Sequence, residues 1–480
     1  MYISKDGGDE MRFTILHTND IHSRFENFAK ISTKINELRD ENTIVLDAGD
    51  FNDFMRLELQ GTMGRAGSEL LSIAGYDAIA MGNNEGFAGI EAAEVLAASN
   101  SISFLSCNLY KFSNNSNKTN ENSLITLEGV KRSRILEKSG VKFLIIGTSP
   151  YGKINEFYNL SGMHTTNAVD EIKKEIEKNT GKYDICILLS HCGMKEDEEI
   201  ANLVDDIDII INGHSHILMD EAIKINNSII HMSGCYGEYL GKLHFEYDGR
   251  INSFEGININ INSSEPNECI IKSLKANKEK AINKLSEPLY KINENLWHDV
   301  VEENPISNFL ADALREVLKC DIGIINSGVL NGGLKKGEVS KKKLLEICPS
   351  PLNPTEMKVL GKDIKEAFKE SLDSDFCMQD GKGSGFRGKY LGRLHLSGGY
   401  IEYIGKDIVN FFIGDKPLEE DRWYSIATSD YLQRGTGYTN LSNNKLIKYN
   451  AEYLRDTLEE YLQKNEFVIS AHYERWIKIK

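Results

Sequence analysis

The first half of the chain repeats one pattern, a short apolar run that ends in a polar turn. The pattern recurs at residues 12–20, 43–50, 76–85, 142–150, 184–193 and 208–216. Stretches with helical spacing of apolar residues, such as 28–39 and 168–178, lie between these runs. Because continuous apolar strands joined by helices must be covered on both faces, this half is predicted to be an α/β fold. Residues 228–261 alternate apolar and polar side chains, which predicts antiparallel strands at an edge.

The sequence divides into two regions around a polar break. Its 480 residues exceed what one hydrophobic core organises, so more than one domain is expected. The composition turns polar at residues 261–267, and apolar residues then recur at helical spacing over 268–292. We therefore predict a first domain over 11–262, a linker helix over 263–296 and a second domain of helices and strands over 297–480.

The charge balance argues against nucleic acid and membranes as partners. Lysine and arginine total 56 while aspartate and glutamate total 72, which gives a net charge of −16. A chain this acidic has no general attraction for nucleic acid or an anionic bilayer. The sequence also contains no apolar stretch of the roughly 18 residues that a membrane span needs. The 8 cysteines form no CxxC pair, and residues 1–10 contain no apolar signal core, so a cytoplasmic location is expected.

Side chains that bind metals follow the apolar runs of the first half. Asp20 and His22 are two positions apart on an extended tip, so both point to one side, and His214 and His216 repeat that spacing. The remaining candidates at strand ends are Asp50, Asn83 and His191. Open α/β sheets collect their ligands at the carboxyl ends of strands. One such pair alone is weak evidence for a metal site, because such pairs are common in cores and on surfaces. The whole series, with each member at a strand end, is much stronger evidence.

These nitrogen and oxygen donors suit Zn²⁺, Mn²⁺ or Fe rather than Ca²⁺. They are numerous enough for two ions, which need an anionic bridging oxygen when they lie about 3.5–4 Å apart. Two such ions can share a hydroxide nucleophile that attacks phosphorus, and they can hold two oxygens of a phosphate for in-line displacement. The donor set is therefore typical of a site that cleaves phosphate esters.

The motifs HTNDIHS, DAGD, GNNE, SHCG and NGHSH resemble those of the calcineurin-like metallophosphoesterases. They are most similar to the 5'-nucleotidase, UDP-sugar hydrolase and 2',3'-cyclic-nucleotide phosphodiesterase family. ENPISNFLADAL, IINSGV and ATSDYL resemble that family's C-terminal domain, and GNNEG with CPSPLNP resembles its unsecreted bacterial branch, the YunD-like proteins. The resemblance implies a four-layer α/β/β/α sandwich joined by a helix to an α+β substrate-binding domain. It also implies a metal-dependent phosphoric ester hydrolase that acts on a nucleotide or a related small phosphate ester.

Carried over to this sequence, the resemblance assigns the candidate ligands to two divalent ions. Asp50 would bridge the ions. The first ion would be held by Asp20, His22, Asp50 and His216. The ligands of the second ion would be completed by Asn83, His191 and His214.

The sequence departs from the family at one catalytic position. The family's GNHE reads GNNE here, so Asn84 stands where a histidine supports the phosphate or the leaving group, and the aspartate that orients the histidine is absent. Asparagine donates hydrogen bonds but does not act as an acid near neutral pH. We expect slower hydrolysis, or hydrolysis limited to good leaving groups. Glu85 and His231 are alternative acids, although a solvated loop carboxylate and a packed core histidine are the more common roles of such residues.

The second domain retains only part of the family's substrate site. Asn326 keeps the first residue of a motif whose arginine is lost, and Tyr431 keeps one of two stacking aromatics. A single stacking face supplies about 1–3 kcal/mol and little discrimination between bases. Arg387 and Arg393, within the glycine-rich segment 381–393, are candidate replacements that would hold an anion. Such segments are also common turns, so both interpretations stay open.

The leading hypothesis is a dinuclear-metal phosphohydrolase of nucleotides or related phosphate esters that uses Mn, Zn or Fe. The alternative is a metal-binding ligand sensor with little catalytic activity, which the asparagine at position 84 and the lost arginines favour. The complete set of metal-binding side chains favours the enzyme.

Overall fold

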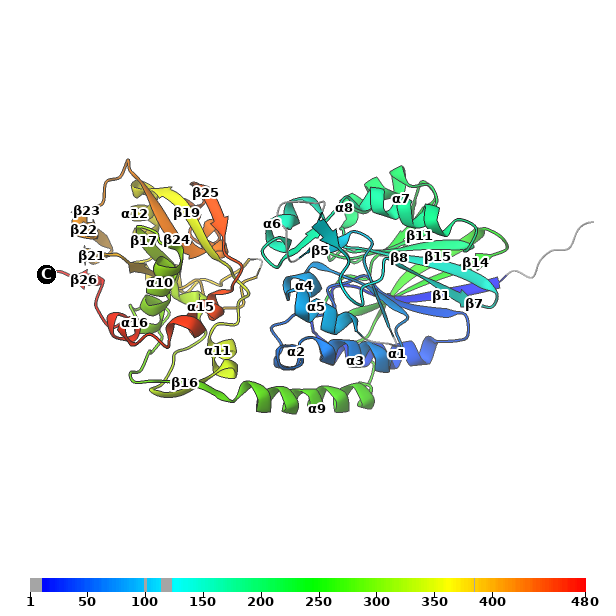
Figure 1. Cartoon of the computed structure of the whole chain (residues 1–480), viewed down its shortest axis with the longest axis horizontal. Coiled ribbons are helices and arrows are strands. Elements are labelled where there is room, and N and C mark those ends of the chain that lie inside the picture. Colours follow the sequence, from blue (N-terminus) through cyan, green and yellow to red (C-terminus); the bar gives the residue numbers. More distant parts are fainter. Residues whose placement is uncertain (1–10, 99–101, 114–122, 384) are drawn as a thin grey trace, which may run out of the picture. The chain divides into compact units, whose positions relative to one another are not determined.

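The computed structural model describes residues 11–98, 102–113, 123–383 and 385–480 (Figure 1). Residues 1–10, on which the expected location partly rests, lie outside this part of the chain. The chain divides into two compact units, Met1–Ile282 and Asn283–Lys480, and each is described by itself.

Unit 1 contains two 6-stranded sheets. The first has the order β15-β14-β1-β2-β3-β4, in which β1 to β4 run parallel and β14 and β15 add an antiparallel edge. Its strands are β1 (Met11–Thr18), β2 (Thr43–Asp47), β3 (Ala78–Ala80), β4 (Ser103–Leu105), β14 (Tyr239–Tyr247) and β15 (Ile251–Asn260). The second has the order β12-β13-β11-β10-β8-β7, with antiparallel strands at both edges. Its strands are β7 (Ser133–Lys138), β8 (Val141–Thr148), β10 (Ile185–Ser190), β11 (Ile209–Asn212), β12 (Ile223–Ile225) and β13 (Ser228–His231).

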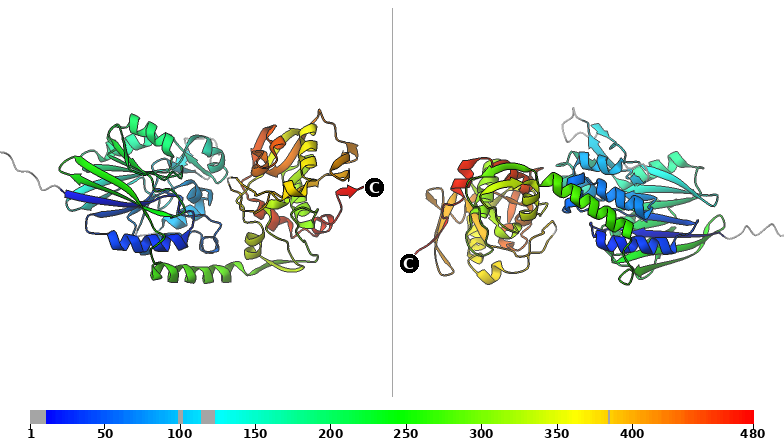
Figure 2. Two further views of the ribbon diagram at one scale, coloured as in Figure 1. Left: turned by 180° about the vertical axis from the view of Figure 1, so that it is seen from behind. Right: turned by 90° about the horizontal axis from the view of Figure 1, so that it is seen from below.

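The alternation of side chains along these strands produces separate apolar layers. Phe13 and Ile15 of β1 point into the core between the sheets, where Phe13 packs edge-on against Phe143 at 5.2 Å between ring centroids. Leu16 points the opposite way, toward the helices of the first sheet, and Leu188 points toward those of the second. These helices are α1 (Phe25–Leu38), α3 (Arg65–Ala74), α5 (Ile90–Ala97), α7 (Ala168–Asn179) and α8 (Met194–Leu203). The predicted four-layer α/β/β/α sandwich is confirmed (Figures 1 and 2).

One predicted edge differs from the structure. Residues 228–261 were expected to form consecutive antiparallel strands. Instead, β13 joins the second sheet and runs parallel to β11. Ile229 and Ile230 are both buried, so β13 is covered on both faces, as strands inside parallel sheets are. Of residues 228–261, β14 and β15 form the predicted antiparallel edge, which belongs to the first sheet.

Helix α9 (Glu268–Leu285) packs on unit 1, where Asn277 Nδ2 donates a 3.0 Å hydrogen bond to Glu69 of α3. The predicted helical stretch reached residue 292, but Pro288–Ile292 forms strand β16 instead. Proline lacks a backbone N–H and disfavours helical geometry at the residue before it, which explains why α9 ends early. The smaller elements of unit 1 are α2 (Leu57–Thr62), α4 (Asn83–Phe87), α6 (Asn155–Tyr158), β5 (Leu109–Phe112), β6 (Leu124–Ile125) and β9 (Met163–Thr165).

Unit 2 is an α+β domain. A 5-stranded sheet has the order β20-β17-β24-β19-β25, and a 4-stranded sheet has the order β23-β22-β21-β26. The strands are β17 (Ile322–Asn326), β18 (Gly337–Ser340), β19 (Pro354–Leu360), β20 (Leu394–Ser397), β21 (Gly399–Ile404), β22 (Asp407–Ile413), β23 (Lys416–Pro417), β24 (Trp423–Ser429), β25 (Asn444–Tyr449) and β26 (Trp476–Lys478). The helices are α10 (Pro305–Leu318), α11 (Lys341–Ile347), α12 (Gly361–Glu370), α13 (Ser374–Cys377), α14 (Asp430–Gln433), α15 (Leu454–Tyr461) and α16 (Asn465–Ser470).

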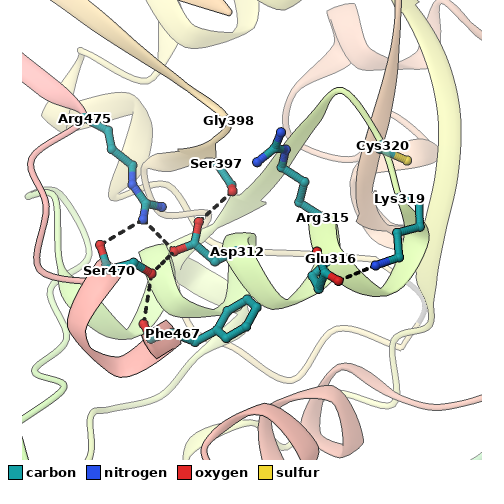
Figure 3. Close-up of a pocket in the computed structure, with 10 residues that line it drawn as sticks. All are labelled: Asp312, Arg315, Glu316, Lys319, Cys320, Ser397, Gly398, Phe467, Ser470 and Arg475. Atoms are coloured by element: carbon teal, nitrogen blue, oxygen red, sulfur yellow. Dashed lines mark hydrogen bonds and ion pairs between the residues drawn. The ribbon is translucent and has the colours of Figure 1, made fainter. Parts of the chain in front are cut away.

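A cavity of about 530 Å³ lies beside α10 in unit 2 (Figure 3). Its wall is held together by Asp312, whose carboxylate accepts hydrogen bonds from Ser397 Oγ at 2.6 Å and Ser470 Oγ at 2.8 Å. Arg475 Nη2 donates a third at 2.6 Å. Because these groups satisfy one another, Asp312 serves to join α10, β20 and α16. None of the predicted substrate-binding residues lines this cavity.

Within the described ranges, no helix combines the length and the apolar character that crossing a bilayer requires.

Candidate metal centre

The predicted ligands lie on the turns that follow the central parallel strands of unit 1. Asp20, His22 and Asp50 adopt positive φ angles of 51°, 45° and 53°, and His214 and His216 adopt 70° and 55°. Left-handed backbone at such residues costs about 1–3 kcal/mol each and persists only where the surroundings enforce it. Hydrogen bonds of 2.9 Å between the turns do so, from Asp20 N to Gly49 O and from His22 N to Asp50 O. These five residues therefore keep a strained backbone that directs their side chains to one place.

Five of the predicted ligands converge into two groups that share Asp20: Asp20 with His22 and His216, and Asp20 with Asp50 and His191. Asp20 Oδ1 lies 3.2 Å from His216 Nε2, 3.7 Å from His22 Nε2 and 3.8 Å from His191 Nε2. Asp50 Oδ1 lies 3.3 Å from His191 Nε2, and Asp50 Oδ2 lies 3.8 Å from His22 Nε2. The two oxygens of Asp50 thus face both groups, while its bridging role stays a prediction.

The other two predicted ligands lie beside these groups. The ring of His214 is 5.2 Å from that of His191, measured between centroids. Asn83 is the first residue of α4, directly after β3, and its Oδ1 is buried.

Buried atoms without a hydrogen-bond partner test whether a metal fits here. Among the described residues, Asp20 Oδ1, Asn83 Oδ1 and His191 Nε2 are buried and have no hydrogen-bond partner. An unpaired buried polar group costs about 1–3 kcal/mol, so several at one place need an explanation. All of them are acceptors or lone-pair donors of the kind that Zn²⁺, Mn²⁺ and Fe prefer. The residues present therefore fit divalent cations.

Contacts behind the ligands fix their orientation. His191 Nδ1 lies 2.7 Å from the carbonyl oxygen of Ala48, so Nδ1 carries the proton and Nε2 keeps its lone pair for a cation. Asp20 Oδ2 accepts hydrogen bonds from Asn19 Nδ2 at 2.8 Å and from His214 N at 2.9 Å, which leaves Oδ1 for the centre.

The electrostatics of the centre favour a bound cation. Burial alone would lower the pKa of His191, but Asp50 and Asp20 raise it to about 10. Burial would raise the pKa of Asp50, yet His191 and His22 hold it well below its ordinary value. Asp20 and Asp50 thus stay ionised in a buried place and hold a positive charge beside them. Without a cation that charge is a proton on His191 Nε2, which a divalent ion would displace to use the lone pair.

Glu85 does not face the centre as an acid. It is fully buried and accepts hydrogen bonds from the backbone N–H groups of Asp50 at 3.1 Å, Gly82 at 3.1 Å and Asn52 at 2.9 Å. Burial and the nearby Asp50 raise its pKa to about 7. Glu85 therefore ties the turn after β2 to the turn after β3. The interpretation of Glu85 as a solvated loop carboxylate is wrong, because its side chain points inward, a direction that the sequence does not reveal.

The other alternative acid, His231, contacts another buried histidine. Its Nδ1 lies 2.8 Å from His17 Nε2 in the buried space between the sheets, and burial lowers its pKa to about 4. Asn84 lies at the centre itself, with its amide nitrogen 2.8 Å from His22 Nδ1.

The predicted substrate-binding residues in unit 2 gather around the segment 381–393, and most are buried. Asn326 Nδ2 donates a 2.6 Å hydrogen bond to Leu391 O. Tyr431 is fully buried, and Phe386 stacks on its ring at 4.5 Å between centroids and 23° between planes. Phe386 was not anticipated, and its place between glycines was the only sequence signal for it.

The two arginines of that segment differ in exposure. Arg393 is 5% exposed, and its guanidinium lies 4.0 Å from the ring centroid of Trp476. Arg387 is exposed, and its backbone N–H donates to Ser350 Oγ at 2.9 Å. Arg387 is thus the arginine of the pair that solvent reaches, and the roles of both stay a prediction.

Comparison with known proteins identifies the architecture. The calcineurin-like phosphoesterase family matches residues 13–218, and the 5'-nucleotidase C-terminal domain matches residues 281–443. The chain belongs to the metallophosphoesterases that carry a 5'-nucleotidase C-terminal domain. This confirms the resemblance seen in the motifs, and the ligands described above lie on the metallophosphoesterase domain.

Relatives of this metallophosphoesterase span nearly its whole length. It is 29% identical over 463 residues to the uncharacterized metallophosphoesterase YunD of Bacillus subtilis, a match that covers 93% of this chain and 98% of YunD. It is 24% identical over 529 residues to a 5'-nucleotidase of Vibrio vulnificus, covering 95% and 90% of the two chains.

Solved structures share the fold. The NAD nucleotidase NadN of Haemophilus influenzae superposes with a TM-score of 0.64 at 19% identity, covering 98% of this chain and all of that one. A 5'-nucleotidase precursor of Thermus thermophilus gives a TM-score of 0.56 at 18% identity with the same coverage.

Proposed function

We propose that this chain hydrolyses nucleotides or related small phosphate esters with the help of divalent metal ions. The observation that carries the proposal is that three atoms able to bind a metal are buried without a hydrogen-bond partner at one end of the parallel strands. They are Asp20 Oδ1, Asn83 Oδ1 and His191 Nε2. The match to a phosphoesterase domain followed by a 5'-nucleotidase C-terminal domain, and the full-length similarity to a 5'-nucleotidase of Vibrio vulnificus, support the same activity.

The proposed centre holds two ions, drawn from Mn, Zn and Fe, with Asp50 between them. The ions would be bound by Asp20, His22, Asp50, Asn83, His191, His214 and His216. When bound, such ions polarise the phosphate oxygens and supply a hydroxide nucleophile at neutral pH. The turns described above hold in place the carboxylates and imidazoles that would bind these ions.

Asn84 is assigned to the catalytic position. The amide nitrogen of Asn84 faces His22 Nδ1 at 2.8 Å. A cation on His22 Nε2 would put the ring proton on Nδ1, and the amide would then turn over so that its oxygen accepts from Nδ1. The amide NH₂ group is then available to donate to a phosphate oxygen. Because Asn84 transfers no proton, and Glu85 and His231 are engaged elsewhere, the leaving group departs without an acid from these residues.

Unit 2 is proposed to bind the part of the substrate that is farther along the molecule from the phosphate. We keep the predicted division into a metallophosphoesterase domain over 11–262, a linker over 263–296 and a substrate domain over 297–480. The binding residues proposed there are Asn326, Tyr431, Arg387 and Arg393. A cytoplasmic location, with a small phosphate ester rather than nucleic acid as partner, fits the net charge of −16.

The second candidate function is a metal-binding ligand sensor with little catalysis. Asn84 favours it, because an asparagine at the catalytic position transfers no proton. Turnover of bis-p-nitrophenyl phosphate decides between the two. Release of p-nitrophenol that depends on Mn²⁺ supports the enzyme, and metal binding without release at any pH supports the sensor. AMP, cyclic nucleotides and dinucleotides then identify the ester class.

A further inference from the structure

A tyrosine stands at the edge of the metal centre on a strained turn. Tyr236 has a φ of 58°, and its ring is 38% exposed. Its backbone is held from two sides, because its N–H donates to Asp20 O at 2.8 Å and its carbonyl accepts from Asn27 Nδ2 at 2.9 Å. A left-handed conformation at a bulky residue marks a place where the surroundings impose a direction on the side chain.

That direction places the ring beside the metal-binding histidines. The centroid of the Tyr236 ring is 5.7 Å from the ring of His22 and 5.7 Å from the ring of His216. Ile217 and Leu218, which follow His216, are each 42% exposed. The centre is therefore bordered by the exposed ring of Tyr236, and two exposed apolar residues follow His216 in the chain.

A cation lies over the same ring. The guanidinium carbon of Arg24 is 5.3 Å from the Tyr236 centroid, and Arg24 itself is exposed. Within the described part of the chain, this guanidinium forms no ion pair with a carboxylate, although the chain is strongly acidic. A guanidinium beside an aromatic face suits a ligand that is both planar and negatively charged.

We propose that Tyr236 and Arg24 form a subsite for the leaving group of the phosphate ester, which is planar and carries a second anionic group. The subsite rests on the proposed function, since it is placed by the phosphate that the metal centre would hold. The planar ring stacks at the exposed part of Tyr236, and Arg24 pairs with the second negative charge. The subsite belongs to unit 1 alone and uses none of the proposed substrate-binding residues of unit 2.

Phosphonates that the enzyme cannot hydrolyse test the subsite by binding. Calorimetric titration of the metal-loaded full chain compares methylphosphonate, phenylphosphonate and 4-carboxyphenylphosphonate. Wild type is expected to bind phenylphosphonate about tenfold more tightly than methylphosphonate, since stacking on one aromatic ring is worth a factor of about 5 to 150. The carboxyl group should tighten binding by a further several-fold.

Variants separate the ring from the charge. Tyr236→Gly removes the ring and also relieves the strained backbone, so it is expected to stay folded and to lower the phenyl-to-methyl ratio to about one. Tyr236→Phe should keep the ratio, and so should Tyr473→Ala, which removes a 64% exposed tyrosine of unit 2. Arg24→Gln should abolish only the gain from the carboxyl group.

The outcomes distinguish this proposal from the proposed function. A wild-type ratio near one, an unchanged ratio in Tyr236→Gly, or no binding of either simple probe overturns the subsite. If the ratio behaves as expected but wild type cleaves no phosphate ester, the subsite stands and hydrolysis is wrong. If wild type hydrolyses esters while the ratio is one, hydrolysis stands and the subsite is wrong.

Discussion

Glu85 accepts a 3.1 Å hydrogen bond from the backbone N–H of Asp50. Through this contact the carboxylate of Glu85 sets the backbone position of Asp50, a predicted metal ligand. The same oxygen of Glu85 also accepts from Gly82 N, the residue before Asn83. Two turns that carry predicted ligands, from neighbouring strands, are therefore held by one buried side chain.

Replacing Glu85 by glutamine should loosen the centre while preserving side-chain size. One carboxylate oxygen becomes an NH₂ group, which leaves backbone donors unpaired at about 1–3 kcal/mol each. We expect a loss of about that size in the free energy of unfolding, measured with urea, together with weaker metal binding. Glu279→Gln, on the exposed face of α9, is the matched control. Wild-type stability and metal content in Glu85→Gln would show that Glu85 holds nothing.

Asn84 should influence the affinity of the metal bound by His22. Groups that accept the second ring proton of a metal-binding histidine typically change metal affinity about 10–100-fold when removed. Asn84→Leu is expected to weaken one metal site by that factor, and Asn84→Asp, which still accepts the proton, to retain it. Competition with a chromophoric chelator measures both affinities. Equal metal affinity in the leucine variant would mean that the amide does not support His22.

The reaction should depend steeply on the leaving group. General acid help is worth about 10²–10⁴-fold, and none of Asn84, Glu85 or His231 is placed to give it. The kcat/KM for p-nitrophenyl phosphate, whose leaving group needs no proton, should exceed that for ethyl phosphate by at least this range. Similar values for the two esters would reveal an acid elsewhere in the chain.

His395 should make unit 2 sensitive to acid. It is fully buried between Asn304 and Asn308, and burial, followed by the charge of Arg393, lowers its pKa well below the ordinary value. Below a pH of about 6.5 the unfolded chain therefore binds a proton that the folded chain does not, so stability falls as pH falls. The loss contributed by His395 approaches 1.4 kcal/mol per pH unit.

Tryptophan fluorescence isolates this effect, because all 3 tryptophans of the chain, Trp297, Trp423 and Trp476, lie in unit 2. Urea unfolding between pH 7 and pH 5 should show a shallower pH dependence in His395→Asn than in wild type. If both chains respond equally to pH, His395 does not remain neutral in the folded state.

The sequence was sufficient to predict the layers, and it named five side chains that the structure brings together at the strand ends. Apolar runs such as that of β1 have few alternatives once they must be covered on both faces, and their polar ends then have to meet at one edge. What the sequence left open depends on side-chain direction and on long-range pairing. Glu85 could point inward or outward, β13 could join either sheet, and Phe386 could lie anywhere that its glycine-rich segment allowed.

Two metal ions held at the strand ends, with Asp50 between them, can be counted by elemental analysis. The chain is stripped with a chelator, reloaded with Mn²⁺ and freed of excess metal, alongside Asp50→Ala and His216→Ala. We predict two equivalents of Mn in wild type, a loss of both in Asp50→Ala, and chiefly the loss of one in His216→Ala. Two equivalents retained by a folded Asp50→Ala variant would contradict this prediction.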